Sequence, residues 1–178
     1  MTADAPIWLE QLRDQVGQEV GVTDWFTVTQ RDADLFSALT DDWDYMHNDP
    51  DWAQSRFGGT IAHGLYVLSL VPRFLKEVAP SLPIVATADA SVLNYGFDTV
   101  RFISPLRIGE QARDRVELLS LSEKRPGDYL ARYRHTIEGQ LGGRPFLVAE
   151  SLSYYVTDYE GKWGASDGEG EFDEVRRS

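Results

Sequence analysis

The stretch that decides the fold of this chain is IAHGLYVLSLVPRFLKEV, residues 61–78. Its apolar side chains recur so densely that a helix here would be apolar nearly all round, which is typical of a helix buried on most sides. Pro72 has no amide hydrogen and its ring crowds the preceding turn, so we expect a kink at this point. The stretch therefore predicts a central buried helix, which the rest of the chain must cover.

The segments that follow this helix have the character of strands. They are long, rich in Val, Leu, Tyr and Phe, and separated by turn residues. We expect antiparallel strands, joined by hairpins, over residues 91–102, 110–122, 129–138 and 145–157. A sheet wrapped around one apolar helix is an α+β architecture. Because one small sheet seldom covers such a helix on every side, we also expect a second subunit.

Shorter elements precede the central helix. Apolar residues at helical spacing predict an N-terminal helix over 6–15, and β-branched and aromatic residues predict a strand over 21–28. A second amphipathic helix is expected to begin at Thr29 or Gln30 and to end near residue 40. Asp49 precedes a proline, so we expect it to cap a further short helix.

Composition places the chain among globular proteins of one domain. It has 178 residues, 42 % hydrophobic and 26 % charged. We expect a single domain over residues 1–157 and a disordered tail over 158–178, where seven acids face three bases. The chain contains no cysteine, which excludes disulfides and thiolate ligands.

Charge and hydropathy narrow the choice of partners and of location. The net charge is −12 and no basic patch is visible, so we expect no nucleic-acid partner. The longest apolar run is too short for a membrane span, so no membrane partner is expected. The first ten residues lack the features of a signal peptide, and a cytoplasmic location is therefore expected.

Asp42 and His47 lie five residues apart in a loop that carries five acids and no base over residues 41–51. A carboxylate beside a neutral imidazole can hold one water, and His has the pKa best suited to moving protons near neutral pH. The spacing alone favours a capped acidic loop with a surface histidine, because acidic loops are common and two residues are few. Metal binding by Asp42, Asp44, His47 and His63 is a further alternative, although the loop does not match an EF-hand.

His63 and Gly64 stand where the apolar helix is expected to begin. Free amides at a helix N-terminus stabilise a developing anion, and a glycine lets a ligand approach the backbone. The alternative is that Gly64 only permits close helix packing and that His63 caps a backbone group. Elsewhere, we expect Ser69 to be a packing residue and His135 to face solvent.

Together the two stretches resemble the MaoC-like dehydratases, the (R)-specific enoyl-CoA hydratase group of the hot-dog fold. That signature reads Gly-Asp-x-Asn-Pro-aliphatic-His, followed by an apolar stretch that ends in His-Gly. The resemblance implies that Asp42 and His47 are catalytic and that Gly64 supplies the oxyanion hole. Asp41, Asp44 and Tyr45 replace the Gly, Asn and Pro of the signature, in a pattern similar to the nodulation protein N-like branch.

The resemblance also implies an activity and an assembly. The reaction is the reversible hydration of a trans-2-enoyl-CoA to a (R)-3-hydroxyacyl-CoA, without a cofactor or a metal. The protein is then a homodimer whose sheets join edge to edge, with acyl-CoA at the subunit interface. An acyl-CoA thioesterase and a non-catalytic acyl-thioester-binding protein are the alternatives, because the fold hosts both. The residues expected to contact substrate are Asp44, Tyr45, His63, Asn94, Tyr95 and Arg101, with Arg107 a second candidate for the phosphates.

Overall fold

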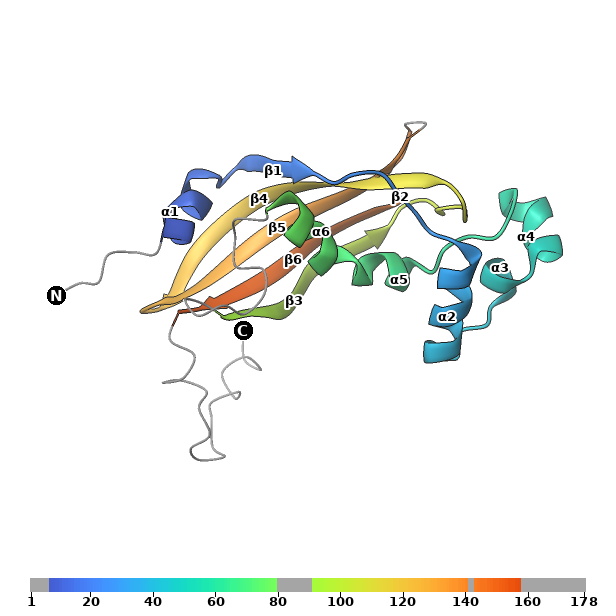
Figure 1. Ribbon diagram of the computed structural model, residues 1–178, viewed down its shortest axis with the longest axis horizontal. Coiled ribbons are helices and arrows are strands. Elements are labelled where there is room, and N and C mark those ends of the chain that lie inside the picture. Colours follow the sequence, from blue (N-terminus) through green and yellow to red (C-terminus); the bar gives the residue numbers. More distant parts are fainter. Residues whose placement is uncertain (1–6, 80–90, 141–142, 158–178) are drawn as a thin grey trace, which may run out of the picture.

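The structure, a computed structural model, describes residues 7–79, 91–140 and 143–157. It confirms the α+β architecture: a curved antiparallel sheet carries helices along one face, and further helices gather beyond one end (Figure 1). The expected tail over 158–178 lies outside the described residues. Within the described ranges, none of the helices combines the length and apolar character that crossing a membrane requires.

Six strands form one sheet in the order β1-β4-β5-β6-β3, with β2 also paired to β4. The long hairpin strands expected in the C-terminal half are present, and β3 forms an edge of the sheet. The bounds are β1 Gln18–Val22, β2 Phe26–Thr27, β3 Ser91–Phe102, β4 Gln111–Arg125, β5 Asp128–Gly139 and β6 Leu147–Val156. The single strand expected over 21–28 is instead two short strands, β1 and β2.

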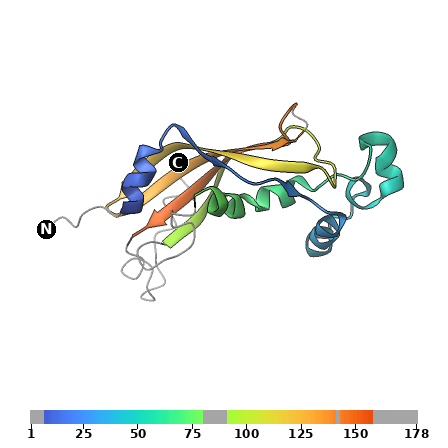
Figure 2. The same ribbon diagram turned by 45° about the horizontal axis from the view of Figure 1, so that its top comes forward.

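The expected central helix is two helices, α5 (Gly64–Ser69) and α6 (Val71–Val78). Both run along one face of the sheet (Figure 2). The break follows from Pro72, which cannot donate an amide hydrogen; the chain instead tightens at Leu70, whose amide donates to the carbonyl of Val67 at 3.2 Å. The helix starts at Gly64 because Ile61 forms a β-bridge with Arg107 instead of helical bonds.

The core lies between the sheet and the helices and has two clusters. The first packs α1 (Ile7–Asp14) and α6 against the sheet, and the second packs α5 and α6 against the other end of it. The opposite face of the sheet carries charged pairs such as Arg113–Glu138 at 2.8 Å. Cover of the central helices is incomplete within one chain, because Leu65 remains 61 % exposed.

A buried polar trio separates the two clusters. His135 lies on β5 between Tyr133 of the first cluster and Ile137 of the second, and it is fully buried. The expectation that His135 faces solvent is therefore wrong. His135 alternates with its neighbours as a strand residue does, but it lies on the face of the strand that the helices cover.

The other two members of the trio satisfy the ring of His135. Its Nδ1 lies 2.6 Å from Oδ2 of Asp114, and its Nε2 lies 2.9 Å from Oγ of Ser151. Burial raises the pKa of Asp114, and the hydrogen bond from His135 partly opposes that rise. A polar group in this position is costly unless it is paired, which explains why all three residues occur together.

Candidate active site

A cavity of about 470 Å³ lies where α5 begins, beside the segment that follows β3. Its wall is largely apolar, and its titratable members are Asp42, His47 and His63. A mostly apolar cavity with a few convergent polar groups is typical of a small-molecule site. The wall is completed by Met46, Phe57, Ile61, Ala62, Gly64, Leu65, Val67, Phe102, Ile103, Ser104, Pro105, Leu106, Phe146 and Leu147.

The acidic loop is built by helix caps. Helix α2 (Gln30–Thr40) ends at Asp41, which adopts the left-handed conformation with φ 61°. The side chain of Asp44 accepts a hydrogen bond from the amide of Met46 and caps α3 (Tyr45–Asn48). Asp49 caps α4 (Pro50–Phe57), as expected from the proline that follows it. Capping therefore accounts for Asp44 and Asp49 and leaves the carboxylate of Asp42 exposed at the cavity.

His47 is held with one ring nitrogen free. Its Nδ1 lies 2.8 Å from the carbonyl oxygen of Ile61, which can only accept, so Nδ1 carries the hydrogen. In neutral His47, Nε2 therefore has a free lone pair. The amide of Ile61 in turn donates to the carbonyl of Met46 at 3.0 Å, which joins the acidic loop to the segment before α5.

His63 packs directly on His47. The two ring centroids are 3.7 Å apart and the ring planes differ by 24°. The Nε2 atom of His63 lies 3.2 Å from both Oγ of Ser37 and the carbonyl oxygen of Asp42. Burial lowers the pKa of His63, a shift that the nearby Asp42 partly opposes. The structure thus brings Asp42, His47 and His63 together at one place.

This cluster invites comparison with a metal site. Asp42, His47 and His63 each offer a donor atom within 4.8 Å of the others. A metal binds an imidazole nitrogen at about 2.0–2.1 Å along the lone pair, which lies in the ring plane. Because the two rings are stacked with centroids 3.7 Å apart and planes only 24° from parallel, their lone pairs lie in two separate, nearly parallel planes and do not converge on one ion. The geometry therefore does not favour metal binding.

Gly64 is the first residue of α5 and lines the cavity. The residue before it, His63, makes no side-chain hydrogen bond to the start of the helix. A Cβ at position 64 would stand 2.6 Å from Cδ1 of Phe102, closer than any real contact of this kind. A side chain at position 64 would therefore displace the ring of Phe102, a residue that sequence reasoning did not select.

The remaining residues expected to contact substrate do not line this cavity. Asp44 is a helix cap, and Tyr45 is exposed and packs near the ring of Trp52. Asn94 and Tyr95 lie on β3 with exposed side chains. Asp44 and Tyr45 thus lie at the start of α3, and Asn94 and Tyr95 lie on the edge strand of the sheet.

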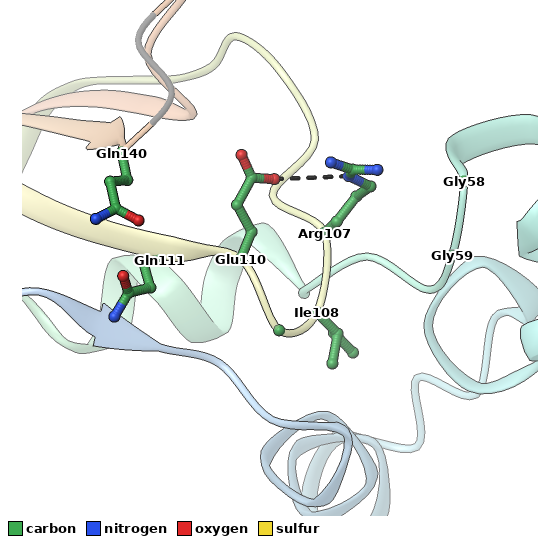
Figure 3. A pocket seen from close by; sticks show the side chains of 8 residues that line it. Gly58, Gly59, Arg107, Ile108, Glu110, Gln111 and Gln140 are labelled. Carbon is green, nitrogen blue, oxygen red and sulfur yellow. Dashed lines mark ion pairs between the residues drawn. The ribbon is translucent and has the colours of Figure 1, made fainter.

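Arg101 and Arg107 lie at two different places. Arg101 is exposed on β3, and its Nη1 donates to the carbonyl of Val100 at 2.8 Å. Arg107 lines a second cavity of about 430 Å³, with Gly58 and Gly59 on one side (Figure 3). Its Nε lies 3.7 Å from Oε2 of Glu110, which forms an ion pair with it.

Sequence reasoning missed a set of polar residues that hold the acidic loop in place. Gln30 donates to the carbonyl of His47 at 2.8 Å and accepts from Oγ1 of Thr60 at 2.7 Å. Ser37 donates to Oδ1 of Asn48 at 2.9 Å. Gln30 and Ser37 are seven residues apart, which places them on one face of α2 two turns apart. Two polar residues on one face of an amphipathic helix are the sequence feature that could have indicated these contacts with the acidic loop.

Comparison with known proteins adds independent observations. The profile described as the MaoC like domain matches residues 11–138. The chain is 34 % identical over 141 residues to 3-hydroxyacyl-thioester dehydratase Z of Mycobacterium tuberculosis, covering 79 % of this chain and 90 % of that protein. It is 36 % identical over 152 residues to nodulation protein N of Rhizobium leguminosarum, covering 84 % and 92 %.

Solved structures are similar over the same region. The (R)-hydratase PhaJ1 of Pseudomonas aeruginosa superposes with a TM-score of 0.61 at 25 % identity, covering 80 % of this chain and 83 % of that one. A protein of Archaeoglobus described as a monoamine oxidase regulatory protein superposes with a TM-score of 0.68 at 25 % identity, covering 89 % and 100 %.

Proposed function

The chain belongs to the MaoC-like domain family, and from that premise we propose that it is a hydro-lyase acting on acyl thioesters. The reaction is the reversible addition of water to a trans-2-enoyl-CoA, which gives a (R)-3-hydroxyacyl-CoA. The printed names of its relatives, a 3-hydroxyacyl-thioester dehydratase and a (R)-hydratase, support this class of reaction. The observation that carries the proposal is the approach of Asp42 and His47 within 4.8 Å at an apolar cavity.

Asp42 and His47 activate the water. A water with hydrogen bonds of about 2.8 Å can bridge two groups roughly 5 Å apart, which suits the separation of these side chains. Because Nδ1 of His47 donates to Ile61, Nε2 is the atom that takes a proton from the water. The hydroxyl of this water adds at C3 of the substrate, and the proton taken from the water passes to C2, so that one water is added across the double bond.

The amide of Gly64 stabilises the charge that forms on the thioester oxygen. Such a donor lowers the barrier by a few kcal/mol in comparable sites. Gly64 lines the cavity, and the apolar wall of the cavity takes the acyl chain. The reaction moves only water and protons and therefore requires no cofactor.

We infer a homodimer with the substrate at the subunit interface. The edge strand β3 has no neighbour beyond it within the described chain. Leu65, Tyr95 and Phe102 lie along α5 and this strand and are 61, 46 and 51 % exposed. An open strand edge beside exposed apolar side chains is suited to pairing with a second copy.

The test is the loss of enoyl absorbance from crotonyl-CoA in wild type, Asp42→Asn and His47→Gln. We expect hydration by wild type and a loss of at least about 100-fold in each variant, since each removes a proton-transfer group. Asp51→Asn, an exposed acid on α4, is the matched control and should keep wild-type activity. Undiminished turnover in both site variants, with circular dichroism unchanged, contradicts the proposal.

Two further assays separate the alternatives. A thioesterase releases free thiol from a saturated acyl-CoA, whereas a hydratase does not. A non-catalytic binding protein is protected by acyl-CoA against thermal unfolding but forms no product. Repeating the hydration assay across enoyl chain lengths defines the acyl group that the cavity accepts.

A further inference from the structure

The hydrogen-bond partners of His63 fix the position of its proton. Asn48 donates its side-chain amide to Oδ1 of Asp34 at 3.0 Å, so the oxygen of Asn48 faces Ser37. Ser37 therefore gives its own hydrogen to Asn48, at 2.9 Å, and can only accept from His63. The carbonyl of Asp42 is also only an acceptor. Nε2 of His63 consequently carries a hydrogen that is shared between Ser37 and Asp42, each 3.2 Å away.

Through this hydrogen, His63 holds the residue that bears the carboxylate. The side chain of Asp42 is exposed, so its position depends on the backbone of the loop. Asp41, just before it, has the left-handed conformation that turns the chain out of α2. The bond from His63 to the carbonyl of Asp42 pins the loop immediately after that turn.

His63 also supports the imidazole of His47. The stacked contact at 3.7 Å covers one face of the His47 ring, while the Nδ1 bond to Ile61 fixes its rotation. His63 also contacts two residues of α2, Phe36, with ring centroids 5.0 Å apart, and Ser37. His63 is 3 % exposed and is wedged between α2 and the two residues assigned to water activation.

We propose that His63 is a positioning residue: as a neutral imidazole with its hydrogen on Nε2, it holds Asp42 and His47 in their working arrangement. The role differs from the substrate contact expected for this residue, and it rests on the proposed function of Asp42 and His47. The titratable groups that face His63 are Asp42 and His47 themselves. A charged His63 would lie buried against the ring that must accept a proton, which is why the neutral form suits the role.

Paired substitutions test the role by kinetics. His63→Leu removes the donor and should lower kcat for crotonyl-CoA by about 100-fold with little change in KM, because misplaced catalytic groups cost rate more than binding. His63→Gln places a donor amide near the former Nε2 and should recover kcat to within about tenfold of wild type. A third variant, Ser37→Ala, removes one of the two acceptors of the His63 hydrogen. Its control is Ser69→Ala, because Ser69 is exposed on α5 and donates to the carbonyl of Tyr66.

Two kinetic results overturn the proposal. One is a His63→Leu variant that folds and keeps wild-type kcat. The other is a His63→Gln variant that folds but is no more active than the Leu variant, because a donor would then have no value at this position. Ser37→Ala should cost less than His63→Leu, because the carbonyl of Asp42 still accepts the hydrogen.

A measurement on the wild-type protein does not depend on activity or on the folding of any variant. Long-range ¹H–¹⁵N correlation spectra at pH 7.5 should show the Nε2–H tautomer for His63 and the Nδ1–H tautomer for His47. A Nδ1–H tautomer on His63 overturns the inference even if the protein hydrates enoyl-CoA. If wild type shows the predicted tautomers but no hydratase activity, the proposed function is contradicted and the tautomer assignment is not.

Discussion

The ring of Phe102 lies so close to Gly64 that any side chain at position 64 would displace it. A Cβ at position 64 would stand 2.6 and 2.7 Å from two ring atoms of Phe102, whereas real Cβ contacts stay above 3.0 Å. Gly64 begins α5 and Phe102 ends the edge strand β3, so this contact joins the central helix to the rim of the sheet. Both residues line the larger cavity.

Gly64→Ala should therefore displace Phe102 and disturb the cavity. We expect hydratase kcat/KM to fall by about tenfold or more, since overpacking of this kind costs roughly 1–3 kcal/mol. Adding Phe102→Ala should restore much of the loss, because the space that the Cβ needs is then free. A double-mutant cycle measures the coupling. Strictly additive effects of the two substitutions would show that the contact does not matter to the site.

Asp41→Gly should stabilise the protein by about 0.5 kcal/mol. Asp41 has a φ of 61°, a conformation that glycine adopts without strain and that other residues adopt at some cost. The MaoC-like signature has glycine at this position, which the backbone geometry explains. Urea unfolding measures the change. Asp51→Gly, in the first turn of α4, is the control and should destabilise by roughly 0.5–1 kcal/mol, because it lowers helix propensity and removes a carboxylate from the helix N-terminus. A loss of stability in Asp41→Gly contradicts the argument.

Ser151→Ala should destabilise the protein by about 1–3 kcal/mol. The substitution leaves Nε2 of the fully buried His135 without its partner at 2.9 Å, and an unsatisfied buried polar group costs this much. Ser120→Ala, exposed on β4, should change stability by less than about 0.5 kcal/mol. Equal losses of unfolding free energy in the two variants, measured in urea, would show that the hydrogen bond between Ser151 and His135 does not stabilise the fold.

The stability of the protein should depend on pH through His63. Its pKa is lowered in the folded state, mainly by burial, so the unfolded chain binds this proton more readily. The stability that neutral His63 contributes is fully present above its pKa in the unfolded chain, about 6.5. It is lost as pH falls below that value toward the lower pKa of the folded state. Between pH 7.5 and 5.5, wild type should lose more stability in urea unfolding than His63→Gln does. Parallel losses in the two proteins would contradict this reading.

Leu65→Asp should convert a dimer to a monomer. The side chain is 61 % exposed on α5, beside the free edge of β3, and a buried unpaired carboxylate there would oppose association. Ile7→Asp, at a residue 76 % exposed on α1 near the other end of the sheet, is the control and should leave the dimer intact (Figure 1). Sedimentation velocity distinguishes the two states. A monomeric wild type would contradict the proposed assembly.

Much of the fold could be read from local patterns. The long strands of the C-terminal half, helix α2 and the cap at Asp49 lie close to where period, propensity and turn residues place them. Pro72 was also a reliable sign, although it divides the central stretch into two helices instead of bending one. These features depend on residues near one another in the chain, which is why the sequence carries them.

The phase of a strand is a different matter. His135 alternates correctly with its neighbours, but which face the helices cover depends on the position of β5 at the centre of the sheet. In the same way, Asn94, Tyr95 and Arg101 lie exposed on an edge strand, outside the set of residues that line the cavity, and their expected contact with substrate stays a prediction. Neither outcome follows from spacing, because both depend on what packs against each side.

The sequence by itself therefore determined the elements, the caps and the chemical groups that stand at the site, since those follow from short-range sterics and hydrogen bonding. Only the tertiary structure decided how these groups are used. It set Asp42, His47 and His63 within 4.8 Å of one another, placed Ile61 and Ser37 beside the two imidazoles, and brought Phe102 against Gly64. Those relationships depend on the packing of segments distant in sequence, and the local pattern of residues does not encode them.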